Sequence, residues 1–445
     1  MKKMKQKKKK MRNGSILFSF GFLFLVAATA SAASVPVLAK PQTVPVVSPA
    51  LYVLAEDNSM AMAGLLGTSI EFEADDFARA VNLSRVDSIT VTKAPPMTDG
   101  ELRVGSTVVS AGQTISGANL SLLSYTAKSR SLTTSSFRFR VGESPVELTC
   151  KLYLLDKANA SPTLHMVPKT SLEVSTHRNI TLYGTLPCYD PDGDETIIEI
   201  VSYPETGLLT LTDRKTGAYT FIPGENYTGK DSFTYVARDI YGNYSASATV
   251  SLTVVKPTTS AVYADMEDSP SYNAALTMTE AGVMGGTQVG GSTYFYPSRT
   301  VSRGEFVVMA MQTLGIREVA DVDQTVFSDD SAIPSEIKGY VATAYELGYI
   351  QGEIDENGHR CFYPSREITR AEAAVMIGNM IDAATPTVTP GFTDSSEIPA
   401  WAASSLYSLN SMGIMTAADG SIEPTAAVTR GDAAEILSAL LITLE

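Results

Sequence analysis

The chain has 445 residues, of which 44% are hydrophobic and 18% charged, and its formal net charge is −14. This length allows several domains, and the acidic balance argues against a nucleic-acid partner, because phosphate binding requires a basic surface. The spacing of the three cysteines fits no metal motif. A disulfide between Cys150 and Cys188 is the alternative in an oxidising exterior, but the two fall in different predicted domains, so we expect three unpaired thiols.

Residues 1–32 have the features of a secretory signal. Seven lysines and one arginine precede an apolar stretch, Ile16 to Val26, and Ala30-Ser31-Ala32 fits a small-residue cleavage site. The alternative is an uncleaved membrane anchor, but the apolar run is short for a membrane span. Removal of these eight basic residues changes the net charge to −22. We therefore expect an exported, soluble chain.

Residues 33–49 contain four prolines and predict an extended spacer. The next stretch, residues 50–157, alternates apolar and polar residues with period two, which predicts half-buried strands. Turn residues separate these segments. The pattern predicts an immunoglobulin-like β-sandwich, with strands at residues 69–73, 87–91, 101–104 and 136–141.

Residues 158–256 predict a second β-sandwich, and their motifs are more specific. Strand patterns recur at residues 197–201, 208–211, 218–221, 231–235 and 249–254. The stretches Tyr189–Asp194 and Asn226–Tyr235 resemble a bacterial cadherin-like, immunoglobulin-type module. That resemblance implies a stalk or adhesive arm whose surface or matrix partner the sequence does not name.

Three aspartates in this second module alternate as calcium ligands do: Asp190, Asp192 and Asp194. The stretch is not an EF-hand loop, because Val201 stands where the twelfth-position acid would be. The alternative is an Asp/Gly turn whose side chains bond to their own backbone. We expect no other cofactor.

After a linker at residues 257–262 the chain repeats one pattern three times, at residues 263–318, 325–384 and 390–445. Each repeat opens on an aspartate, and these aspartates are 64 and 65 residues apart. A helix-length segment follows, then a loop, then a Ser/Thr-Arg-x-Glu/Asp motif and an apolar stripe. A fixed period with one internal order indicates an internal repeat. No single repeat can bury both of its stripes, so we expect the three to form one helical body.

The Ser/Thr-Arg-x-Glu/Asp motif predicts a capping box at a helix start, with Glu305 and Glu372 as acids that reach back to the cap. Arg303, Arg370 and Arg430 then occupy the first helical position. There a guanidinium adds to the partial positive charge of the helix start and suits a carboxylate or phosphate. The alternative is that each arginine pairs with a nearby acid.

These three segments resemble S-layer homology (SLH) repeats, the cell-wall anchors of bacterial surface proteins. Thr369 to Glu372 matches the Thr-Arg-Ala-Glu motif, and the other two repeats carry variants of it. The resemblance implies an all-α pseudo-trimer that binds a secondary cell-wall polysaccharide, often pyruvylated. It implies that the three arginines meet the acid, and that grooves between the repeats are lined by Asp265, Asp329 and Asp394. It also implies a sugar-stacking tryptophan, which remains only as Trp401.

The fold class we expect is therefore two all-β immunoglobulin- or cadherin-like sandwiches followed by an all-α pseudo-trimer. The function we expect is a non-enzymatic surface protein, exported to the cell wall and anchored there by its repeats. From residue 261 onward 25 acids face 8 bases, so an anionic polymer must be held by local arginines or bridged by cations. Alternatives are an anchored glycan hydrolase and an S-layer lattice subunit.

Overall fold

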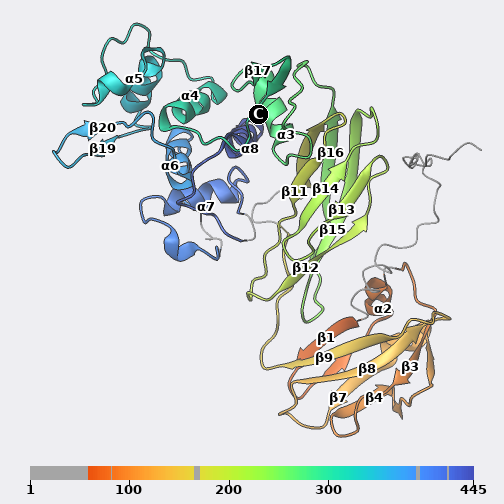
Figure 1. Cartoon of the computed structure of the whole chain (residues 1–445). Coiled ribbons are helices and arrows are strands. Elements are labelled where there is room, and N and C mark those ends of the chain that lie inside the picture. The colour runs from red at the N-terminus through yellow and green to blue at the C-terminus, as the bar shows by residue number, and fades with distance from the viewer. Residues whose placement is uncertain (1–58, 82, 165–170, 387–390, 418–419, 445) are drawn as a thin grey trace, which may run out of the picture. The chain divides into compact units, whose positions relative to one another are not determined.

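The computed structural model describes residues 59–81, 83–164, 171–386, 391–417 and 420–444 (Figure 1). The expected signal and spacer lie outside these residues. The expected fold class is confirmed, because two β-sheet regions precede a helical region. Among the described residues, no helix combines the length and apolar character needed to cross a membrane.

The first β region consists of two sheets. Its larger sheet has the strand order β1 (Ser59–Leu65), β9 (Leu148–Leu155), β8 (Thr134–Val141), β3 (Ser88–Lys93), β6 (Thr114–Ser116). Its smaller sheet has the order β2 (Ser69–Glu71), β7 (Leu123–Ala127), β4 (Gly100–Val104), β5 (Thr107–Val108). A 3-10 turn, η1 (Gly117–Leu122), leads into β7. All four strands expected from the alternation are present.

The core of this region is aromatic. Phe72, Phe77, Phe137 and Phe139 are fully buried, and Phe77 meets Phe139 edge to face with ring centroids 5.3 Å apart. Phe77 belongs to a helix, α2 (Ala74–Ala80), that the alternating pattern did not predict.

The second β region also has two sheets. One has the order β10 (Ser171–His177), β16 (Ala248–Val255), β15 (Gly229–Asp239), β12 (Thr196–Ser202). The other has the order β11 (Leu182–Thr185), β14 (Ala218–Ile222), β13 (Leu208–Leu211). The strand β10 pairs in parallel with β16, and the other pairings are antiparallel. Phe221, Phe233 and Tyr235 fill the space between the sheets without exposure to solvent.

The helical region contains three repeats of one pattern, a helix followed by a loop and then a capped helix. Repeat 1 has α3 (Tyr272–Glu280), the hairpin β17 (Thr287–Val289) and β18 (Ser292–Tyr294), and α4 (Arg303–Thr313). Repeat 2 has the turns η2 (Asp330–Ala332) and η3 (Ser335–Ile337), α5 (Lys338–Glu346), β19 (Glu353–Ile354), β20 (Arg360–Cys361) and α6 (Arg370–Met380). Repeat 3 has η4 (Ser395–Glu397), α7 (Ala403–Ser411) and α8 (Arg430–Leu444).

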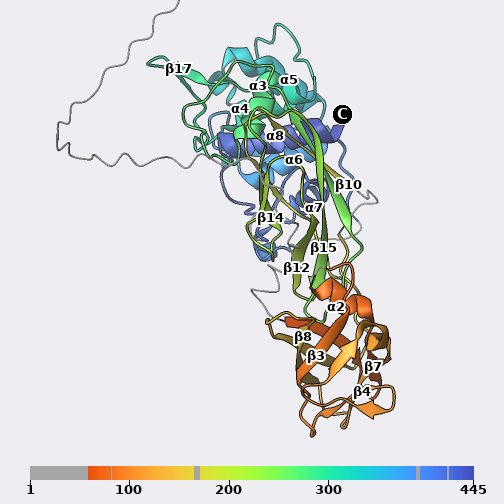
Figure 2. The same ribbon diagram turned by 90° about the vertical axis from the view of Figure 1, so that its right-hand side faces the viewer.

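The three repeats close into a ring. The capped helix of each repeat packs against the first helix of the next: α4 against α5, α6 against α7, and α8 back against α3, which Figures 1 and 2 show side by side. The backbone at the centre is also cyclic. The Val301 amide donates to the Val428 carbonyl, Val428 to Ile368, and Ile368 to Val301, at 2.9–3.0 Å. The first and third repeats are thus joined as the neighbouring ones are.

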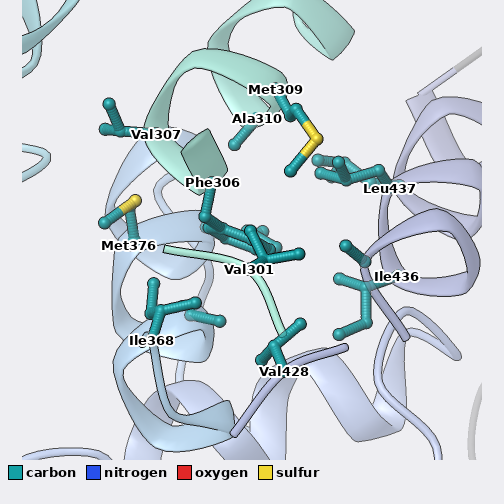
Figure 3. Close-up of a cluster of buried hydrophobic side chains, with 14 of the residues drawn as sticks. Val301, Phe306, Val307, Met309, Ala310, Ile368, Met376, Val428, Ile436 and Leu437 are labelled. Atoms are coloured by element: carbon teal, nitrogen blue, oxygen red, sulfur yellow. The ribbon is translucent and has the colours of Figure 1, made fainter. Parts of the chain in front are cut away.

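Apolar residues of all three repeats share the core inside this ring (Figure 3). Val301, Phe306, Ile368 and Val428 are fully buried and point toward one another, with Ile436 from α8 beside them. Each repeat contributes the residue that precedes its Ser/Thr-Arg motif. The motifs are therefore held around one centre, in the same phase.

Candidate functional site

The predicted capping boxes are present at the start of α4, α6 and α8. The Ser302 hydroxyl accepts from the Glu305 amide at 3.2 Å, and the Glu305 carboxylate accepts from the Ser302 amide at 2.9 Å. Thr369 with Glu372, and Thr429 with Asp432, repeat the arrangement. The carboxylates of Glu305 and Glu372, which we expected at a polysaccharide site, are therefore first of all helix caps.

Each motif arginine lies at the junction between its own repeat and the next repeat in the ring. We name the three junctions after their arginines. The Nε atom of Arg303 donates to the Phe362 carbonyl at 3.1 Å. Arg370 donates to the Ile422 carbonyl at 2.8 Å, and Arg430 to the Phe295 carbonyl at 2.8 Å. Three side chains far apart in sequence thus make one and the same inter-repeat contact.

The opening aspartates shape the loops that receive these arginines. Asp329 accepts hydrogen bonds from the amides of Phe362 and Tyr363 at 2.8 and 2.7 Å. Asp265 binds the amides of residues 295 and 296, and Asp394 those of residues 422 and 423, at 2.7–3.0 Å. The aspartates therefore lie beside the arginine contacts, and their oxygens are occupied by backbone amides.

Burial alone would raise the pKa of the Asp394 carboxyl. Hydrogen bonds from the Ile422 amide, the Ser421 hydroxyl and the Glu423 amide outweigh it, so that the pKa is lowered. The pKa of Glu305 is likewise lowered, with burial opposed by hydrogen bonds from the Ser302 amide and from Arg299. Both groups stay ionised under neutral conditions, Asp394 holding its loop and Glu305 capping α4.

The three arginines differ in what surrounds them. Arg303 lies 3.3 Å from Glu372 and 3.8 Å from Glu353, and its side chain is 8% exposed. Arg370 and Arg430 instead donate a second hydrogen bond to backbone, to the carbonyls of Thr416 and Gly285 at 2.7 Å. Within the described residues, no carboxylate lies within 4.0 Å of either guanidinium. The alternative of an internal acid partner thus describes Arg303 alone.

Trp401, the expected sugar-stacking residue, precedes α7 and is 60% exposed. Two further aromatic residues that the sequence analysis did not single out lie in repeat 1. The rings of Tyr294 and Tyr296 stack with centroids 5.8 Å apart, and Tyr296 is 41% exposed. Their spacing of two residues, on either side of the buried Phe295, was the available signal.

In the second β region the structure corrects the expected calcium set. Asp190 and Asp194 are brought together with Asp239, and candidate ligand atoms of the three lie within 4.8 Å of one another. Asp192 is not part of this group, because its carboxylate accepts from the Ala160 amide at 2.7 Å and faces Lys157. Asp239, at the end of β15, is 40 residues or more from the Asp-rich turn, so local spacing could not reveal it.

The chemistry of the aspartate group fits a hard cation. One oxygen of Asp190 accepts from the Asp192 and Asp194 amides, as the turn alternative expects. The other oxygens, Oδ2 of Asp190 and of Asp194, are buried without a hydrogen-bond partner among the described residues. Burial, and then the charges of Asp190 and Asp239, raise the pKa of Asp194. Buried, unpaired carboxylate oxygens are what a calcium ion would satisfy.

Comparison with known proteins finds two families of domain in the chain. A model of the bacterial cadherin-like domain matches residues 159–256, and a model of the S-layer homology domain matches residues 262–307, 326–374 and 391–434. An amylopullulanase of Thermoanaerobacterium thermosulfurigenes is 28% identical over 134 residues, which cover 29% of this chain and 7% of that protein.

Similar solved structures include human CDH23 EC21-23 (14% identity, 45% of this chain, 68% of that chain, TM-score 0.21). The fibronectin(III)-like modules of Clostridium thermocellum CbhA are also 14% identical, over 44% of this chain and 91% of that chain, with a TM-score of 0.21.

Proposed function

The chain carries a bacterial cadherin-like domain followed by three S-layer homology domains, which anchor proteins to the cell wall at the surface, and on this premise we propose its specific role. The helical ring binds a secondary cell-wall polysaccharide through anionic groups on the polymer. The two β regions are displayed outward as a stalk or interaction module. The chain acts as a binding protein and not as an enzyme.

The observation that carries the proposal is the ring itself. It brings three arginines to equivalent junctions, and two of them have no acidic partner within ion-pair distance among the described residues. A guanidinium held by backbone carbonyls at a helix start keeps donors directed to an incoming carboxylate or phosphate. Because this region has an excess of acids over bases, such local sites support polymer binding better than overall charge does.

The test is co-sedimentation of residues 33–445, the part that would remain after signal cleavage, with purified cell-wall sacculi. Sacculi stripped of their secondary polymer by acid serve as the control. Binding to intact sacculi that vanishes on stripping supports the proposal. Binding that is equal on stripped sacculi would point to peptidoglycan instead, and no binding at all would refute anchoring. Glycan release from sacculi in the same tubes would favour the hydrolase alternative, and ordered arrays would favour the lattice alternative.

A second binding function, for calcium, is favoured by the two unpaired carboxylate oxygens in the cadherin-like domain. Asp190, Asp194 and Asp239 would hold the ion, which supplies the positive charge that compensates three clustered carboxylates. Calcium should raise the unfolding temperature of the β regions, and Asp194→Asn should reduce that rise. Asp192→Asn, which changes a neighbouring acid outside the group, is the control. An unchanged unfolding temperature with millimolar calcium would rule the site out.

A further inference from the structure

The three junctions have one backbone geometry but different side chains. The residue after the carbonyl that receives each arginine has a left-handed backbone in every repeat, with φ between 51° and 59°. This corner is Tyr296 at the Arg430 junction, Tyr363 at the Arg303 junction and Glu423 at the Arg370 junction. Because the corners are equivalent, a difference in what they present to a ligand comes from their side chains.

At the Arg303 junction, other side chains of this protein already contact the arginine and the ring of the corner tyrosine. Glu372 and Glu353 both lie within 4.0 Å of Arg303. Arg366 contacts the same two glutamates, and its guanidinium lies over the Tyr363 ring, 5.4 Å from the centroid. A polymer anion here would have to displace two internal carboxylates, and a sugar would have to displace Arg366.

At the Arg370 junction the corner itself is acidic. Glu423 replaces the tyrosine. Ala426 takes the place of Arg366, because the Ala426 carbonyl accepts from the Arg370 amide just as the Arg366 carbonyl accepts from the Arg303 amide. A carboxylate at the corner repels an anionic sugar, and no aromatic ring stands at this position to stack on it.

The Arg430 junction keeps one of the two acids but lacks the other. The strand pairing of β17 with β18 places Thr287 opposite Tyr294, just as Glu353 stands opposite Cys361 in repeat 2. Glu353, the more distant of the two acids beside Arg303, is therefore replaced by a threonine, and the cysteine by a second tyrosine. The counterpart of the nearer acid, Glu372, is Glu305, which pairs with Arg299 at 2.7 Å; among the described residues neither it nor any other acid lies within 4.0 Å of the Arg430 guanidinium. The Arg430 amide donates to the Arg299 carbonyl at 2.8 Å. Burial and then the charge of Arg299 lower the pKa of Arg430, and the charge of Glu305 opposes them. Arg430 thus contacts Phe295, the residue between the two stacked, partly exposed tyrosines, without a direct acidic partner among the described residues.

We propose that the Arg430 junction is the principal polysaccharide site of the ring, and that it takes an acidic sugar. The anionic substituent binds Arg430, and a sugar ring lies against Tyr294 and Tyr296. Aromatic faces pack well against the apolar faces of sugars, and tyrosine hydroxyls stay in water. This inference rests on the proposed wall anchoring, and it assigns to Arg303 a structural role.

Two matched pairs of variants test this assignment in the sacculus assay with residues 33–445. Arg430→Gln should weaken the apparent affinity about tenfold, the loss typical of one charge-assisted contact, whereas Arg303→Gln should bind like the unmodified protein. Tyr296→Asn should also weaken binding, and Tyr363→Asn should not. Asparagine suits these corners because it tolerates a left-handed backbone. Circular dichroism verifies that each variant is folded before binding is measured.

The outcomes separate this inference from the anchoring proposal. If the unmodified protein fails to bind sacculi, the anchoring proposal is wrong. If it binds, but folded Arg430→Gln and Tyr296→Asn bind equally well, the assignment of the Arg430 junction is overturned. Sacculi whose carboxylates have been amidated with a carbodiimide identify the anion. Lost binding then assigns a carboxylate, and retained binding assigns a phosphate.

Discussion

Replacing Asp329 with alanine should destabilise the ring without abolishing wall binding. Its carboxylate accepts two backbone hydrogen bonds, from Phe362 and Tyr363, in the loop that also receives Arg303. Hydrogen bonds to a charged group are each worth about 1.5–3 kcal/mol. Because Asp329 is only half-buried, the lower value applies, and the two together give about 3 kcal/mol.

For a domain of this size, that loss lowers the unfolding temperature by about 6–12 °C. The assay is a thermal melt followed by circular dichroism at a helix-sensitive wavelength. Glu336→Ala is the control, because it removes the same charge from an exposed position in the same repeat, where the Glu336 carboxylate accepts a hydrogen bond from the adjacent Ser335 hydroxyl. Surface changes of that kind stay within about 0.5 kcal/mol. Equal melts for the two variants would refute the structural role assigned to the opening aspartates.

The same variant distinguishes stability from binding. At a temperature below its melting point, Asp329→Ala should bind sacculi like the unmodified protein, since the Arg430 junction is built from other residues. A large loss of binding in a variant that remains folded would mean that the Asp329 carboxylate itself meets the polymer.

Three further outcomes are expected. The pKa of Asp394 is lowered in the folded state. Its stabilising contribution is therefore complete above the unfolded pKa of about 3.9 and is lost as pH falls through the folded value. The ring's unfolding temperature should fall in acid, and it should fall less steeply in Asp394→Asn. Phe306→Ala empties a fully buried site at the centre of the ring and should cost about 3–5 kcal/mol in denaturant unfolding, whereas Val289→Ala, at a half-exposed site, should cost little. Burial raises the pKa of the Cys150 thiol well above its usual value, so a thiol reagent should label Cys150 only after unfolding; rapid labelling of the folded chain would contradict the packing of β9.

Local patterns predicted the local elements. The alternation at residues 136–141 predicted a strand because every second residue there faces a core, and β8 buries Phe137 and Phe139. The Thr369–Glu372 motif predicted a capped helix because both halves of a capping box lie within four residues. The helix α2 was missed because its seven residues lie inside a β pattern and are too few to establish a helical period.

The sequence predicted the residue types of the candidate site better than it predicted which residues they contact. Contacts such as Arg430 with Phe295 join residues 135 positions apart, and they exist only because the ring closes. Asp239 joins Asp190 for the same kind of reason, since the fold and not their spacing in sequence brings them together. The internal neutralisation of Arg303 by Glu353 likewise depends on a hairpin that no motif marks.

The cyclic hydrogen bonding among Val301, Ile368 and Val428 limits how the number of repeats can change during evolution. An open array of repeats can be shortened or lengthened at either end, because each unit needs only its neighbours. A closed ring of three has no end unit, so losing one repeat leaves two others with unpaired backbone and an uncovered apolar face. The number of repeats is then fixed by geometry. Sequence variation is then confined to the side chains at the junctions. There, one arginine can take a structural role while another remains available to a ligand.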